Sequence, residues 1–264
     1  KGTFIKVNAF PGFSHLQSAV MYGQLTGKAF TLMNVPLALS VALCASLVPI
    51  IAEAFYLGRR RELIKRVDMA VKLSNVISLP SSLGMFFMAY PIMHLVFMRD
   101  AAGYEILKYI SICIPFVILT QTSTAILQSI GNYMKPVYNL ALGCIVKVIV
   151  TYILVSVSFV NIYGAVIGTI LGYITSCLLN MHDLKKSLNI KFNKIDAFVK
   201  PAIAAIIMIV AVVFSDAIVY NYTMSGGLSC IISILIGVIV YLIFIFLLRV
   251  FEYQEIKNKF LSNK

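Results

Sequence analysis

The sequence predicts an all-α polytopic membrane protein with about seven transmembrane helices. The chain is 60% hydrophobic and only 12% charged, with a mean hydropathy of +0.93. A soluble domain carries about twice that charged fraction. Each apolar run is about as long as, or longer than, the ~20 residues that a helix needs to cross a bilayer. The runs are residues 21–52, 70–98, 106–131, 137–160, 164–181, 198–219 and 228–248.

Basic residues gather at the ends of these runs and predict the orientation of the chain. The formal net charge is +12. Because cytoplasmic loops are enriched in Lys and Arg, we expect residues 58–66 and 185–200 in the cytoplasm. Residues 1–20 then form an outer leading segment, 21–250 the membrane bundle and 251–264 a cytoplasmic tail. The positive charge fits membrane lipid headgroups, and the sequence has no basic patch interleaved with aromatics that would indicate nucleic acid.

No catalytic or metal-binding pattern stands out. The five cysteines all lie inside apolar runs without a C-x-x-C pair, and the three histidines are far apart. The sequence has no P-loop, no H-E-x-x-H and no G-x-S-x-G motif. We therefore expect neither an enzyme nor a resident cofactor or metal ion.

Polar side chains recur at helical spacing within three runs, as they do on water-facing helix faces. Lys147 is the sharpest case, because a lysine at mid-depth costs at least ~2.5 kcal/mol and should face protein or water. We expect Lys28 and Lys147 to point into one interior cavity. The predicted cavity-lining residues are Gln24, Lys28, Thr31 and Asn34 in the first run, Gln121, Thr124, Gln128 and Asn132 in the third, and Asn139, Lys147 and Thr151 in the fourth.

These stripes also have a structural interpretation. Lys147 can be neutralised, paired or directed to the membrane surface, and amides or hydroxyls can bond neighbouring helices instead of a ligand. Pro36 and Pro49 can bend the first run beside a substrate path or merely improve its packing. A ladder of small residues at spacing four predicts close helix packing alone. Its members are Gly164, Gly168, Gly172 and Ser176.

Several segments resemble a known family. They are residues 22–28 (YGQLTGK), 32–43 (LMNVPLALSVAL), 46–55 (SLVPIIAEAF) and 128–136 (QSIGNYMKP). They are similar to the stage V sporulation protein B group of polysaccharide biosynthesis proteins. That group belongs to the multidrug/oligosaccharidyl-lipid/polysaccharide exporter superfamily, which also holds MATE, MurJ and Wzx proteins.

The resemblance implies that the chain is the C-terminal lobe, spans 8–14, of a MATE/MurJ-like transporter in the bacterial cytoplasmic membrane. It implies a flippase for an undecaprenyl-pyrophosphate-linked saccharide, with the N-terminal lobe and membrane lipids as further partners. A cation-coupled multidrug exporter of the same superfamily and a non-transporting scaffold for cell-wall synthesis remain alternatives. MurJ-type proteins place an arginine where this chain has Thr31, and Lys28 lies one turn earlier.

Overall fold

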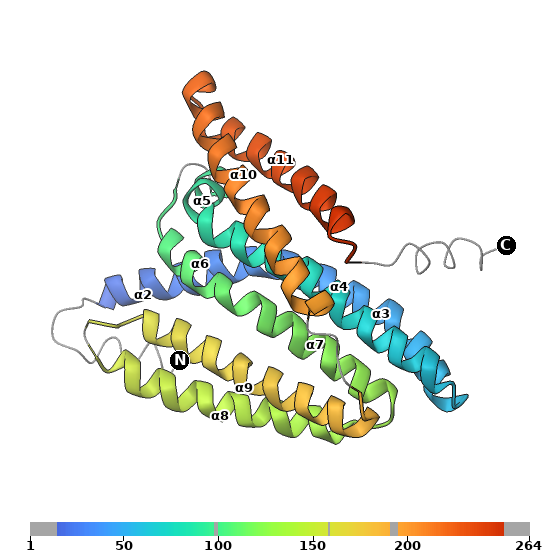
Figure 1. The fold of residues 1–264 in the computed structure, drawn as a ribbon. Helices are drawn as coiled ribbons and strands as arrows, with labels where there is room; N and C mark the ends of the chain where they lie inside the picture. Colours follow the sequence, from blue (N-terminus) through green and yellow to red (C-terminus); the bar gives the residue numbers. More distant parts are fainter. Residues whose placement is uncertain (1–14, 98–99, 158, 191–194, 251–264) are drawn as a thin grey trace.

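The computed structural model describes residues 15–97, 100–157, 159–190 and 195–250, and these residues form helices joined by short turns (Figure 1). The elements are α2 (His15–Gly23), the π-helix η1 (Gln24–Ala29), α3 (Phe30–Tyr56), α4 (Arg60–Phe87), α5 (Ala89–Val96), α6 (Tyr104–Ile110), the 3-10 turn η2 (Ser111–Cys113), α7 (Ile114–Ser129), α8 (Met134–Val155), α9 (Tyr163–Leu188), the π-helix η3 (Ile195–Val199), α10 (Lys200–Thr223) and α11 (Gly226–Leu247).

The described chain has the predicted membrane-protein architecture. Six continuous helical segments of this part are long and apolar enough to cross a membrane, and the pair α4–α5, bent by 84°, makes a seventh. The prediction of an all-α bundle with about seven spans is confirmed. The predicted leading segment, residues 1–20, overlaps α2, which begins at His15. The predicted tail, 251–264, lies outside the described residues.

The second predicted span, residues 70–98, is not one straight helix. α4 ends at Phe87, α5 begins at Ala89, and Met88 between them has φ −101° and ψ 19°. Pro91 stands in the first turn of α5, where its missing N–H is tolerated. A straight helix would press its ring against the carbonyl of Phe87, four residues earlier. Pro91 therefore favours the turn that the chain makes at this point.

The basic segment predicted as a loop is helical from Arg60 onward. Leu63 and Val67, one turn apart, are 6% and 0% exposed, so this turn is anchored in the bundle. Glu62 lies 3.4 Å from Arg66 at i,i+4 spacing, which supports a helix. Arg, Glu and Leu are also strong helix formers, and the helix continues beyond the apolar run for these reasons.

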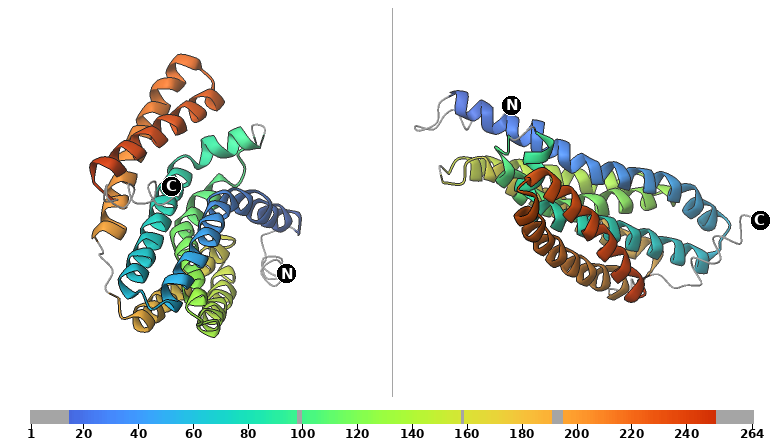
Figure 2. Two further views of the ribbon diagram at one scale, coloured as in Figure 1. Left: turned by 90° about the vertical axis from the view of Figure 1, so that its right-hand side faces the viewer. Right: turned by 90° about the horizontal axis from the view of Figure 1, so that it is seen from above.

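Helix α7 is the centre of the main bundle and packs against α3, α4 and α9, while α8 packs mainly on α9. The hairpin of α10 and α11 leans away from this bundle and contacts it through α4 and α5 (Figures 1 and 2). Two polar contacts fix the hairpin region. Tyr241 donates from its hydroxyl to the carbonyl of Val76 at 2.9 Å, and Asn75 Nδ2 donates to the carbonyl of Ala197 at 2.8 Å.

The turns of the main bundle gather at two ends (Figure 1). At the basic end, Arg60 Nη2 donates to the carbonyl of Leu188 at 3.4 Å, and Lys135 Nζ donates to Ser187 Oγ at 3.1 Å. The outer end holds α2, the α5–α6 connection and the α8–α9 connection. The terms basic end and outer end follow the charge distribution, which predicts that the basic end lies in the cytoplasm.

Candidate functional site

The first predicted stripe begins on a π-helix. Residues Gln24–Ala29 form η1, a type of wide helical turn that is frequent at functional sites. Pro36 and Pro49 lie inside α3, which continues through both. Thr31 and Asn34 are exposed on α3 in the described structure. This part of the stripe therefore faces away from the bundle.

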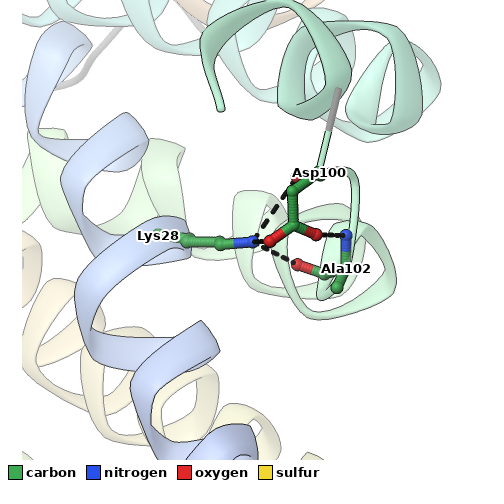
Figure 3. A network of polar contacts seen from close by, with 3 residues as sticks. All are labelled: Lys28, Asp100 and Ala102. Atoms are coloured by element: carbon green, nitrogen blue, oxygen red, sulfur yellow. Dashed lines mark hydrogen bonds and ion pairs between the residues drawn. The ribbon is translucent and has the colours of Figure 1, made fainter. Parts of the chain in front are cut away.

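Lys28 is held by the α5–α6 connection (Figure 3). Its Nζ lies 2.7 Å from Asp100 Oδ2 and 3.3 Å from the carbonyl oxygen of Ala102. Asp100 Oδ1 accepts the backbone N–H of Ala102 at 2.9 Å. Hydrogen bonds from Lys28 and from this N–H hold the pKa of the Asp100 carboxyl below its usual value. The charge of Lys28 is therefore matched by a carboxylate within this bundle.

Gln24 lies one turn before Lys28 and packs on the same connection. Gly103 has φ +91°, a conformation that favours glycine. A Cβ at Gly103 would lie 2.9 Å from the Cβ of Gln24. The glycine thus allows the α5–α6 connection to approach η1 closely.

The second stripe follows the least buried face of α7, and its members have different surroundings. Thr124 Oγ1 accepts a hydrogen bond from Asn180 Nδ2 at 3.0 Å, and Asn132 donates to a serine of α9 at 3.4 Å. Gln128 is exposed. The Oε1 atom of Gln121 is buried without a hydrogen-bond partner in the described part of the chain. Two members of the stripe therefore bond α9, and two keep unused polar atoms.

The third stripe lies in the interface between α8 and α9. Asn139 Nδ2 donates to Asn180 Oδ1 at 2.9 Å and to Asp183 Oδ2 at 2.7 Å. The Oγ1 atom of Thr151 is buried beside Gly168. A cavity role for Asn139 and Thr151 stays a prediction, and within this bundle both side chains are packed between helices. The reason is that small residues on α9 let the two helices close over these side chains.

The small-residue ladder of α9 forms the other side of that interface. A Cβ on Gly172 would lie 2.8 Å from the carbonyl oxygen of Gly143, and one on Gly164 would lie 2.7 Å from the backbone nitrogen of Val155. Ser176 Oγ donates to a backbone carbonyl of α8 at 3.2 Å. The ladder therefore places the backbones of α8 and α9 in direct contact, as small-xxx-small patterns do.

Lys147 lies at the rim of the α8–α9 interface. Its side chain is half-buried and borders a pocket of about 50 Å³ together with Cys144 and Tyr173. Across the described ranges, its ammonium makes no hydrogen bond or ion pair. The structure does not bring Lys28 and Lys147 into one cavity of this bundle, because Asp100 draws Lys28 to the outer end. A shared cavity in a two-lobed protein stays a prediction.

Two polar clusters were missing from the sequence prediction. On α4, Lys72 Nζ lies 2.9 Å from Asp68 Oδ2, with side chains 11% and 22% exposed, and the i,i+4 spacing was the available signal. Asn180 is buried and links Asn139 to Thr124. It continues the four-residue spacing of the α9 ladder. No group of three His, Cys, Asp or Glu side chains that could hold a metal occurs among the described residues.

Comparison with known proteins finds relatives of this chain, among them a lipid II flippase. A family model described as MatE matches residues 25–153. Three proteins of Bacillus subtilis (strain 168) are similar: Stage V sporulation protein B (25% identical), Lipid II flippase MurJ (25%) and Sporulation protein YkvU (26%). The matches cover 69%, 63% and 64% of this chain but 35%, 31% and 38% of those proteins. The matched part of the chain thus spans about a third of the length of these relatives.

A solved structure of Lipid II flippase MurJ in its inward closed conformation shares the fold. The TM-score is 0.66 at 20% identity, over 94% of this chain and 50% of that one. The fold is therefore a membrane bundle that corresponds to half of the MurJ fold. The chain is a distant homologue of the three Bacillus proteins and resembles the multidrug/oligosaccharidyl-lipid/polysaccharide exporter superfamily. This is a superfamily of transporters and not a class of enzymes.

Proposed function

We propose that this chain forms the C-terminal lobe, spans 8–14, of a flippase that moves an undecaprenyl-pyrophosphate-linked saccharide across the bacterial cytoplasmic membrane. Similarity to a lipid II flippase and to two sporulation proteins supports a role in cell-wall, spore-cortex or polysaccharide synthesis. The N-terminal lobe of the same protein supplies the opposite wall of the substrate path. The concentration of positive charge at the basic end supports a cytoplasmic C-terminus.

The observation that carries this proposal is the ammonium of Lys147, which has no counter-charge. A lysine inside an apolar span normally pairs with an acidic group, because burial of the lone charge is costly. In the described part of the bundle, Lys28, Lys72 and Lys200 each have a carboxylate within 2.9 Å, and Lys147 has none. A pyrophosphate would supply the missing negative charge while its polyprenyl tail stays in lipid. An exporter of organic cations would need the opposite charge here.

Complementation of a strain that lacks its lipid-linked saccharide flippase tests the proposal. The Lys147→Ala variant of the protein that carries this chain should lower transport about tenfold or more, since a hydrogen bond to a charged group contributes roughly 1.5–3 kcal/mol. The Lys147→Arg variant keeps the charge and should be less impaired. Lys186→Ala, an exposed lysine on the last turn of α9, is the matched control and should behave as the parent.

Membrane abundance must be equal in all strains, because removal of a half-buried lysine also alters stability. Full complementation by Lys147→Ala at equal abundance would show that this lysine is structural, and the proposal would lose its main support. If Lys147→Ala and Lys147→Arg both fail at normal abundance while Lys186→Ala succeeds, the site requires an ammonium in particular.

A further inference from the structure

We propose that the outer end of this bundle carries a binding site for neutral saccharide rings, formed by Tyr90, Tyr104, Glu105 and Tyr163. The inference rests on the proposed function, because it names a site for the saccharide part of the substrate. A cavity of about 410 Å³ is lined by residues of η1, α5, α6 and the start of α9. Small-molecule sites in proteins commonly enclose roughly 300–1,000 Å³.

Aromatic rings form two adjoining walls of this cavity. The rings of Tyr90 and Tyr104 lie 5.4 Å apart at 88° to each other, and their side chains are 54% and 36% exposed. The ring of Tyr163 is held edge-on by Tyr109 at 5.7 Å and 87°. Tyrosine offers an apolar ring together with a polar tip. A sugar ring can place its C–H face on such a wall while its hydroxyls reach the polar tips.

Hydrogen-bonding groups sit beside these rings. Glu105 Oε2 accepts the hydroxyl of Tyr163 at 2.6 Å, and its Oε1 accepts the hydroxyl of Tyr104 at 3.4 Å. Each carboxylate oxygen keeps a lone pair for another hydroxyl. Gln24 lines the same cavity and supplies both an amide donor and an amide acceptor. Alternating donors and acceptors of this kind suit a polyhydroxylated ring.

The charge of the site selects a neutral ligand. Within the described ranges, no basic side chain pairs with Glu105, so a pyrophosphate placed beside it would be repelled. Lys28, which borders the same connection, is matched by Asp100. An organic ammonium would suit the rings and the carboxylate. It would leave the amide donor of Gln24 unused, and the saccharide is therefore the better match.

The cavity is preformed by contacts within its walls and directly behind them. The ion pair of Lys28 with Asp100 (Figure 3) fixes the α5–α6 connection. The close packing of Gly103 on Gln24 fixes it further. Ile106, at 3% exposure, belongs to the buried core beneath it. A site that needs little ordering retains more of its contact energy on binding.

Saturation-transfer NMR with N,N′-diacetylchitobiose tests this site in the purified protein that carries this chain. The disaccharide should bind saturably, and Tyr104→Ala and Glu105→Gln should each weaken its binding about tenfold. Tyr222→Ala removes a tyrosine that is 86% exposed near the outer end of α10 and is the matched control, with unchanged binding. Size-exclusion profiles and melting temperatures establish that each variant is folded. If Tyr104→Ala misfolds, Glu105→Gln alone decides.

Absence of disaccharide binding, or equal binding in parent and Glu105→Gln protein, would overturn the inference. Binding of tetraethylammonium in place of the disaccharide, with the same dependence on Glu105, would also overturn it and assign the site to organic cations. The assay needs neither a pyrophosphate nor translocation. Transport without disaccharide binding therefore contradicts the saccharide site alone. Disaccharide binding without transport contradicts the proposed flippase function.

Discussion

Replacement of Gly172 by alanine probes the contact between α8 and α9. The new methyl group would lie 2.8 Å from the carbonyl oxygen of Gly143 and 2.9 Å from Lys147 Cβ. Both distances are shorter than ordinary van der Waals contact. The carbonyl of Gly143 belongs to the backbone of α8 and cannot rotate away, so the two helices must separate locally.

The expected magnitude is a balance of two effects. Alanine favours a helix over glycine by roughly 0.5–1 kcal/mol. Overpacking of a closely packed interface costs about 1–3 kcal/mol. The Gly172→Ala variant should therefore lose about 0.5–2 kcal/mol of unfolding free energy. Gly84→Ala on α4 is the matched control, because nothing lies within 4 Å of the Cβ it would add. That variant should be as stable as the parent or more stable.

Thermal unfolding of the detergent-solubilised protein, followed by size-exclusion chromatography, provides the assay. Gly172→Ala should melt below the parent and Gly84→Ala at or above it. Gly168→Leu should melt lower still, because a Cβ there already meets the side chain of Thr151 and lies 3.0 Å from the carbonyl oxygen of Lys147. A Gly172→Ala variant that melts at or above the parent would refute the close approach of α8 and α9.

Three further predictions concern polar contacts. Asp100→Ala should speed hydrogen–deuterium exchange at the backbone amide of Ala102. The pKa of Asp100 is lowered, so its ion pair with Lys28 should stabilise the α5–α6 connection at neutral pH. This stabilisation should be lost only as the pH falls below about 3.9 and through the lowered pKa. Asn180→Leu should lower the free energy of unfolding by about 1–3 kcal/mol, since Asn139 and Thr124 lose their hydrogen bonds to Asn180. An unchanged melting temperature would contradict a stabilising role for these hydrogen bonds. Lys72→Met should lower the melting temperature more than the double variant Lys72→Met with Asp68→Leu, because the single change leaves the Asp68 carboxylate without its partner. A lower melting temperature for the double variant would rule out this ion pair.

The sequence by itself determined the class of the protein and the positions of its spans. Lipid offers no partners for backbone N–H and C=O groups, so apolar runs of this length must be helices. The same logic identified the α9 ladder, because small residues at spacing four leave a groove only a neighbouring helix can fill. It did not predict the bend at Met88, although Pro91 was a visible signal. It also began the second span too late, because good helix formers extend α4 back to Arg60.

Only the tertiary structure decided what each polar face meets. Periodicity showed that Asn139, Lys147 and Thr151 share a face, and the fold placed that face against α9. Lys28 and Asp100 are 72 residues apart, and nothing in their local sequence pairs them. Helical spacing gives the direction in which a side chain points around the axis of its helix. Whether that direction leads to another helix, a carboxylate, water or lipid depends on helices that are distant in sequence, and packing alone brings them together.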